Sequence, residues 1–133
     1  MAAVVVDTHT VLWYLSGDPR LSQPALAAMR AATAGGDPII VPSMCLAEAT
    51  YLVEKSRIPI ADLDSLRLAV SEPASGLRIA PFDLAVAVVL RQIGRDLVPD
   101  LPDRIIAATA LKLGLPLITR DARIQSAGIQ TIW

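Results

Sequence analysis

The stretch AAVVVDTHTVLWYL, from Ala2 to Leu15, decides the fold and raises the first question about function. Its five small or β-branched apolar residues end abruptly at Asp7, and the chain becomes apolar again after Thr10. A continuous apolar run of this kind is typical of a strand buried on both faces, as strands of parallel sheets are. A carboxylate directly after such a strand can cap the next helix or bind a metal ion, and these residues alone leave both explanations open.

Beyond this stretch, segments typical of strands alternate with segments typical of amphipathic helices. Such alternation favours right-handed crossovers, which give an α/β fold with a parallel sheet and helices on both faces. In folds of this kind, ligands bind at the carboxyl ends of the strands. The expected strands span 2–6, 38–42, 77–81, 116–120 and 129–133, and the expected helices span 10–17, 22–36, 43–56, 60–72, 82–94 and 102–114.

The size and composition of the chain are those expected of one compact domain spanning 1–133. Apolar residues make up 53% of the 133 residues and charged residues 19%, so the chain lacks the excess charge of disordered proteins. The net charge of −1 argues against a broad basic surface for duplex DNA. A local basic rim is still compatible with the sequence, because ten of the twelve cationic residues are arginine, which favours phosphate.

The sequence favours a cytoplasmic protein. Cys45 is its only cysteine, so no disulfide can form within the chain, which fits a reducing compartment. The N-terminus lacks the cationic start and long apolar core of a signal peptide. No apolar run approaches the roughly 18 residues of a membrane span, so we expect no membrane association.

Four acidic residues occupy positions near the carboxyl ends of the expected strands. Asp7 follows the first strand, Asp121 follows the fourth, Glu48 lies about one turn into the helix after the second, and Asp103 begins a later helix. Carboxylates brought together repel and raise one another's pKa, and a hard divalent cation relieves that repulsion. Oxygen ligands suit Mg²⁺ or Mn²⁺, so these acids are candidate metal ligands and catalytic residues.

Each of these acids also has a purely structural explanation. Asp7 can cap the following helix, Asp103 can be a first-turn acid favoured by the helix dipole, and Asp121 can begin a turn. Glu48 has the weakest explanation of this kind, because a solvent-facing position among its apolar neighbours needs a narrow polar stripe. The four acids together are therefore more informative than any one of them.

The sequence lacks the residues of several other catalytic sites. His9 is the only histidine, and packing near Trp13 explains it better than catalysis. There is no nucleophile elbow, phosphate-binding loop or dinucleotide-binding motif, and one cysteine with one histidine cannot form a zinc site. Haloacid dehalogenase phosphatases need an acid at position 9, and response-regulator receivers need an acidic pair after the first strand, so both patterns fail.

Four segments in a fixed order resemble the PIN domain family, and most of all the VapC-type toxins of bacterial toxin–antitoxin pairs. The most specific part is an aspartate before RIIAATA followed by TRD after the next strand. The resemblance implies a three-layer α/β/α sandwich around a mainly parallel sheet of four to five strands, and cleavage of RNA with Mg²⁺ or Mn²⁺. The segments are VVVDTHTVLWYL (4–15), IIVPSMCLAEATYLVEK (39–55), DLPDRIIAATALKLGLPLITRDARI (100–124) and GIQTIW (128–133).

The resemblance also implies roles for individual residues. The four acids of the family's metal site fall on Asp7, Glu48, Asp103 and Asp121, and Thr119 matches a hydroxyl position that supports the site. Asp100 matches an acid found in relatives whose helix begins with a DPxDR-like sequence, from which DLPDR departs. Arg104 and Arg120 adjoin two of the proposed ligands, where they can contact phosphate or simply lie on the surface.

Activity and partners follow from the same resemblance. It implies hydrolysis of RNA by a metal-activated water, leaving 3′-hydroxyl and 5′-phosphate ends. It further implies a homodimer bound by a small antitoxin, whose C-terminal segment enters the acidic site with an arginine among the carboxylates. Helices 25–34 and 84–94 are the expected contact surfaces. The alternatives are an inactive RNA- or protein-binding module with this fold and, more weakly, a phosphatase-like hydrolase of phosphate esters.

Overall fold

A five-stranded sheet, parallel throughout, forms the centre of the computed structural model, which describes residues 3–133. The strand order is β3-β2-β1-β4-β5, so the chain begins in the middle of the sheet, builds one half and returns to build the other. This confirms the expected parallel sheet at the upper end of the four to five strands. The strands are β1 Val4–Val6, β2 Ile39–Pro42, β3 Leu77–Ala80, β4 Leu117–Ile118 and β5 Thr131–Ile132.

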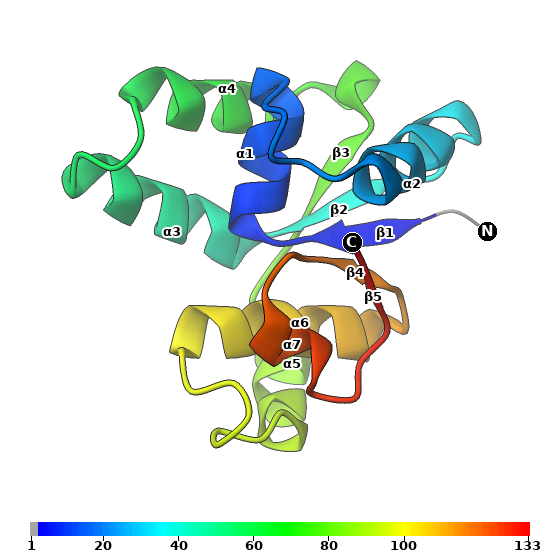
Figure 1. The fold of residues 1–133 in the computed structure, drawn as a ribbon, viewed down its shortest axis with the longest axis vertical. Coiled ribbons are helices and arrows are strands. Elements are labelled where there is room, and N and C mark those ends of the chain that lie inside the picture. Colours follow the sequence, from blue (N-terminus) through cyan, green and yellow to red (C-terminus); the bar gives the residue numbers. More distant parts are fainter. Residues whose placement is uncertain (1–2) are drawn as a thin grey trace.

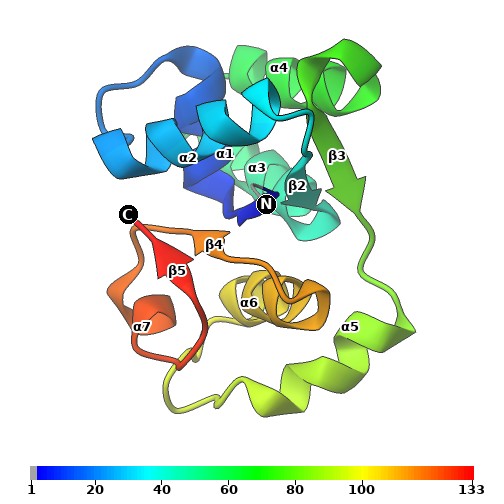
Figure 2. The ribbon, with the colours of Figure 1, turned by 90° about the vertical axis from the view of Figure 1, so that its right-hand side faces the viewer.

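Helices cover both faces of the sheet, which gives the three layers expected of the fold. Figure 1 shows α1 to α4 above the sheet and α5 to α7 below it, and Figure 2 shows the same separation after a quarter turn. Right-handed crossovers place the helices of the two halves of the chain on opposite faces. The helices are α1 Thr8–Ser16, α2 Gln23–Ala34, α3 Ser43–Glu54, α4 Ile60–Ser71, α5 Leu84–Val89, α6 Leu101–Leu113 and α7 Ala122–Gln125, with 3₁₀ turns η1 Pro73–Ser75 and η2 Leu90–Gln92.

The first strand behaves as its sequence predicts. All three residues of β1 are buried, because β1 lies in the centre of the sheet between β2 and β4 with helices on both faces. Ala2, the first residue of the expected strand, lies outside the described residues. The register pairs Val5 with Leu117 and Val6 with Ile118, so the next residues, Asp7 and Thr119, leave the two strands side by side.

The helices follow the expected ranges to within one or two residues at most ends, and two differences have a clear structural cause. The helix expected from residue 10 begins at Thr8, because the Asp7 carboxylate accepts a hydrogen bond from the backbone N–H of Thr10 at 3.0 Å and so caps the first turn. The helix expected over 82–94 ends at Val89 and continues as the η2 turn. The short helix α7 was not expected, although Asp121 caps it by accepting from the N–H of Arg123.

The strand order creates a natural binding crevice. From β1 the chain crosses to β2 on one side, whereas β4 lies on the other side, so the connections leave these two neighbours in opposite directions. Such a switch point leaves a gap at the carboxyl ends of the strands where α/β proteins bind ligands.

Among residues 3–133, no helix has both the length and the hydrophobicity needed to cross a membrane.

Candidate active site

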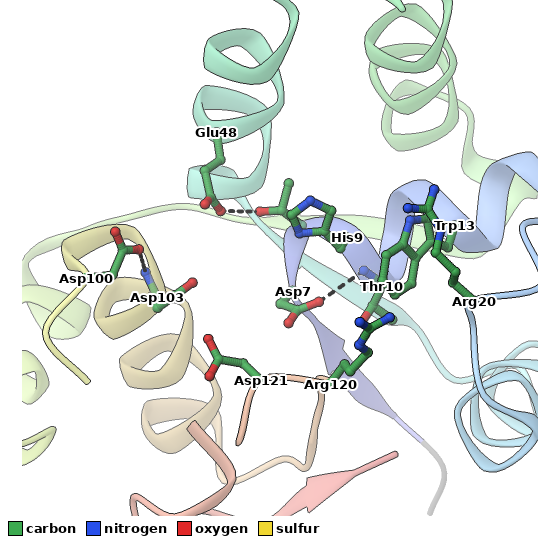
Figure 3. A pocket seen from close by; sticks show the side chains of 11 residues that line it. Asp7, His9, Thr10, Trp13, Arg20, Glu48, Asp100, Asp103, Arg120 and Asp121 are labelled. Carbon is green, nitrogen blue, oxygen red and sulfur yellow. Dashed lines mark hydrogen bonds between the residues drawn. The ribbon is translucent and has the colours of Figure 1, made fainter. Parts of the chain in front are cut away.

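A cavity of about 630 Å³ lies at this switch point, and acids line one end of it. Figure 3 shows side chains from α1, α3, α6 and the connection after β4 converging on it. All four acids predicted from the sequence reach this cavity, together with one that the sequence left uncertain. The lining residues are Asp7, Thr8, His9, Thr10, Trp13, Arg20, Glu48, Asp100, Asp103, Arg120 and Asp121.

The tightest acidic group in the cavity consists of Glu48, Asp100 and Asp103. One carboxylate oxygen from each lies within 4.8 Å of the others, which is close enough for a single cation to contact all three. Asp7 and Asp121 line the same cavity beside this group. The structure thus brings Asp100 into the centre of the cluster, although the departure of DLPDR from the family pattern had put its role in doubt.

Helix α6 delivers two of these acids from its first turn. Asp100 is the N-cap, and its Oδ2 accepts a hydrogen bond from the backbone N–H of Asp103 at 3.1 Å. Pro102 fits this first turn because its fixed φ suits the start of a helix and its missing N–H has no partner there in any case. Asp103 therefore is the first-turn acid that the sequence allowed, and it points into the cavity as well (Figure 3).

Asp7 likewise caps a helix and lines the cavity with the same carboxylate. Its Oδ1 caps α1, while its Oδ2 accepts a hydrogen bond from the buried hydroxyl of Thr119. The same Thr119 oxygen accepts the backbone N–H of Asp121 at 3.0 Å. One hydroxyl therefore fixes the Asp7 carboxylate and the chain leading into Asp121, which gives Thr119 a supporting position at the site.

Glu48 is held by a residue that the sequence did not single out. The hydroxyl of Thr8, which is buried beside Asp7, donates a hydrogen bond to Glu48 Oε1. This bond ties α3 to the first turn of α1 and orients the Glu48 carboxylate toward Asp103 (Figure 3). The only local signal for this role was the hydroxyl directly after Asp7, and hydroxyls are also common in helix first turns for capping reasons.

Burial, and at Glu48 and Asp103 also the neighbouring carboxylates, disfavours the charged form of the acids in the cavity. Burial in the cavity raises the pKa of both Asp7 and Glu48 above the usual carboxyl range. Partial burial, followed by the neighbouring charges of Asp100, Glu48 and Asp121, raises the pKa of Asp103 to about 8. A bound divalent cation would remove this penalty, and all-oxygen ligands are those that Mg²⁺ and Mn²⁺ prefer.

Arg104 does not support this site, which corrects the sequence-based expectation. Its guanidinium donates hydrogen bonds of 3.0 to 3.2 Å to the backbone carbonyl oxygens of Leu90 and Ile93, and it does not line the cavity. The Leu90 carbonyl also accepts the backbone N–H of Ile93, so Arg104 adds a side-chain bond to the η2 turn and binds the Ile93 carbonyl beyond it. Arg104 therefore anchors the end of α5 to α6 instead of contacting a phosphate in the cavity.

The opposite end of the cavity is aromatic and basic. His9 is exposed on α1, and its ring centroid lies 5.5 Å from that of Trp13, as the sequence suggested. Arg20 and Arg120 both lie against Trp13. The sequence did not predict Trp13 and Arg20 as cavity residues. Trp13 lies on α1 and Arg20 in the connection to α2, and only the tertiary fold brings them to Arg120.

Comparison with known proteins points to one family. Residues 4–129 match the family described as PIN domain. Ribonuclease VapC22 of Mycobacterium tuberculosis (strain ATCC 25618 / H37Rv) is 32% identical over 127 residues, which are 95% of this chain and 92% of that protein.

Solved structures of low sequence identity share the fold. The DNA-bound VapBC of Salmonella typhimurium aligns with a TM-score of 0.72 and 22% identity over 98% of this chain and 97% of that one. VapBC2 from Rickettsia felis, solved bound to a DNA fragment from its promoter, aligns with a TM-score of 0.72 and 17% identity over 97% of this chain and 96% of that one. At these identities the likeness establishes the architecture alone.

Proposed function

This chain belongs to the PIN domain family, and from this premise we propose that it is a Mg²⁺- or Mn²⁺-dependent endoribonuclease, the toxin of a toxin–antitoxin pair. The relative that covers 95% of the chain is named a ribonuclease. The observation that carries the proposal is the cluster of Glu48, Asp100 and Asp103 in a cavity at the switch point of the sheet.

The chemistry of the donor set fits a hard divalent cation. Glu48, Asp100 and Asp103 would hold it, with Asp7 and Asp121 beside them as further oxygen donors. When bound, such an ion would neutralise charge at the scissile phosphate and lower the pKa of an attacking water. The ligand assignment is part of this proposal, and the mutual pKa elevation of the acids supports it.

The side chains themselves would orient the reaction. Thr8 and Thr119 hold Glu48 and Asp7 in single orientations, so the carboxylates need no rearrangement when substrate arrives. An attacking water can give its proton to one of these carboxylates as its oxygen bonds to phosphorus and the bond to the 3′ oxygen breaks. The departing 3′ oxygen takes up a proton from solvent water. The products are a 3′-hydroxyl and a 5′-phosphate, and no nucleophilic side chain is required.

We expect the purified protein to cleave single-stranded RNA in Mg²⁺ or Mn²⁺, to stop in EDTA and to resume when the metal is restored. Sequencing of RNA 5′ ends would identify the cleavage sites and verify the 5′-phosphate. Wild-type protein that cleaves several RNAs no faster than Asp7→Asn in either metal would contradict the proposal and favour an inactive module with the PIN fold.

A protein partner is the next part of the proposal. The solved structures that share the fold include complexes titled VapBC and a toxin–antitoxin complex from Klebsiella pneumoniae. We propose that a small antitoxin inhibits this protein by inserting its C-terminal segment, with an arginine, among the carboxylates around Asp7. A complex in which that segment binds far from Asp7 would contradict this.

We also propose a homodimer that uses α5. The apolar residues Ala25, Met29 and Ala32 of α2 lie in the core, so the main apolar face of that helix is already covered. On α5, by contrast, Leu84 is 80% exposed and Val88, one turn later, is 64% exposed. Apolar residues exposed on one helix face are typical of contact surfaces.

Leu84→Asp is expected to convert this dimer into a monomer, because it places a charge in the apolar interface. An acid at the first position of α5 suits the helix dipole, so the fold should tolerate it. Ile60→Asp, at a residue that is 64% exposed on α4, is the matched control and should remain dimeric. Light scattering coupled to size exclusion gives the masses, and a monomeric wild type would refute this interface.

A further inference from the structure

The end of the cavity opposite the acids holds a cluster that metal binding does not explain. The Cζ atoms of Arg20 and Arg120 lie 4.8 and 5.5 Å from the centroid of the Trp13 ring. Figure 3 shows these three side chains on one side of the cavity and Asp100 and Asp103 on the other, with Asp7 between them. The cavity therefore has one acidic end and one end that is basic and aromatic.

The two arginines differ in how far their charge is balanced. Arg20 is paired with Asp18 through an Nη2–Oδ2 contact of 2.8 Å and a second bond from Nε, so its charge is already neutralised. Arg120 is exposed, and it forms no ion pair with any residue of the described part of the chain. The Cζ of Arg120 lies 5.5 Å from the Trp13 ring centroid, a cation–π contact that leaves the charge of the guanidinium unpaired by any carboxylate among residues 3–133. Arg120 is thus a positioned cation with an unused charge, one residue from Asp121.

A smaller hollow of about 180 Å³ continues from this end of the cavity. It shares His9, Trp13 and Arg20 with the main cavity, and its wall includes apolar side chains such as Leu52. Two acids also line it: Asp18, which is paired with Arg20, and Asp62. Arg57 lies at this hollow, is exposed, and has no ion pair within residues 3–133. Aromatic rings, an apolar wall and a flanking cation are the features that receive an unstacked base and its phosphate.

We propose that this end of the cavity is the subsite for the nucleotide next to the cleaved phosphodiester. Arg120 binds the phosphate of that nucleotide, the hollow beside His9 and Trp13 holds its base, and Arg57 contacts the following phosphate. Trp13 is a positioning residue, because it holds the Arg120 guanidinium in place. The inference rests on the proposed function, since a nuclease must hold its substrate beside the bond that it cuts.

Charge favours RNA over a protein segment as the occupant. The chain carries a net charge of −1, and its acidic cluster repels a polyanion, so unpaired cations beside the cluster are needed to draw the backbone in. Stacking on aromatic rings and guanidinium planes accepts any base, which suits binding to a single strand. Arg120 lines the main cavity with the acids, and Arg57 lines the smaller hollow, which shares His9, Trp13 and Arg20 with that cavity.

RNA binding without cleavage tests the subsite. A short fluorescein-labelled single-stranded RNA is titrated with protein in EDTA, which keeps the RNA intact, and anisotropy gives Kd from about 50 to 200 mM KCl. Arg120→Ala should weaken binding about tenfold, through loss of a charge-assisted contact, and lower the slope of log Kd against log salt by about 0.7. Arg57→Ala should lower that slope similarly. Arg30→Ala, an exposed arginine on α2 outside both hollows, is the matched control and should change neither.

Further variants separate phosphate binding from base binding. Arg120→Lys keeps the charge, so it should retain the salt slope while losing part of the affinity that the planar stack provides. Ser16→Trp fills the smaller hollow from the exposed side of α1, and it should weaken binding without changing the slope. Trp13→Phe should keep the fold and raise KM for RNA cleavage while leaving kcat nearly unchanged.

The outcomes distinguish this subsite from the proposed function. Equal affinities for Arg120→Ala and Arg30→Ala would overturn the subsite, even if the protein cleaves RNA with Mg²⁺. No detectable binding of RNA by wild type would overturn it too. Binding that Arg120→Ala weakens, in a protein that never cleaves, would support the subsite and count against the nuclease alone. Loss of affinity confined to a co-purified protein partner, with RNA binding unchanged, would assign the surface to that partner instead.

Discussion

Asp103→Asn is expected to lower kcat/KM for RNA cleavage by about a thousandfold, the largest effect of any single substitution proposed for this protein. Asp103 lies in the tightest acidic group, and partial burial followed by the charges of Asp100, Glu48 and Asp121 raises its pKa to about 8. The amide keeps the size of the side chain but removes the charge that would hold a divalent cation. The backbone N–H of Asp103 still reaches the Asp100 cap, so α6 should begin as before.

A matched pair on α3 checks that the loss reflects the site and not the removal of any acid. Glu48→Gln should lower kcat/KM by a similar factor. Glu54 is exposed at the end of the same helix and lies outside the cavity, so kcat/KM of Glu54→Gln should stay within about twofold of the wild-type value. Rates are measured on a fluorogenic RNA with Mg²⁺ in excess. Equal rates for Glu48→Gln and Glu54→Gln would show that Glu48 is not part of the metal site.

The sheet was predictable because its strands carry a local signal. Val4 to Val6 are continuously apolar and β-branched, and the alternation of strand and helix then fixes a parallel topology. Asp7 and Asp121 could be assigned to one edge for the same reason, since both follow strands. The break at η2 was not predictable, because it depends on Arg104 reaching across from another helix to the carbonyls of Leu90 and Ile93.

The candidate site was only partly accessible from sequence. Asp7 was predicted to be either a cap or a ligand. The structure shows that Oδ1 caps α1 while Oδ2 accepts a hydrogen bond from Thr119 at the cavity, so the capping role does not remove Asp7 from the cavity. The position of Asp100 beside Glu48 was not predictable, because its capping of α6 is local whereas its approach to Glu48 depends on how α3 and α6 pack. The stacking of Arg20 and Arg120 on Trp13 joins three separate segments, and no spacing in the sequence encodes it.

The metal-free protein is expected to lose about 2 kcal/mol of unfolding free energy as the pH rises from about 5 to 8. The folded state raises the pKa of Asp103 from 3.8 to about 8, so it binds this proton more tightly than the unfolded chain does. That contribution to stability is complete below pH 3.8 and is lost as the pH rises through 8. Each pKa unit corresponds to about 1.4 kcal/mol, and solvent screening of this half-exposed carboxyl leaves only part of the full value.

Urea denaturation in EDTA at the two pH values measures this loss. Asp103→Asn removes the group whose pKa is raised to about 8, so it should reduce the pH dependence and make the metal-free protein more stable than wild type at pH 8. The part that remains comes from Asp7 and Glu48, whose pKa values burial also raises. Glu54→Gln should keep the wild-type slope. Because a cation binds the ionised carboxylates, Mg²⁺ should stabilise wild type more at pH 8 than at pH 5, and its affinity should rise up to about tenfold per pH unit in between. A stability that increases with pH in EDTA, or a slope that Asp103→Asn leaves intact, would show that the acids do not repel one another as their arrangement requires.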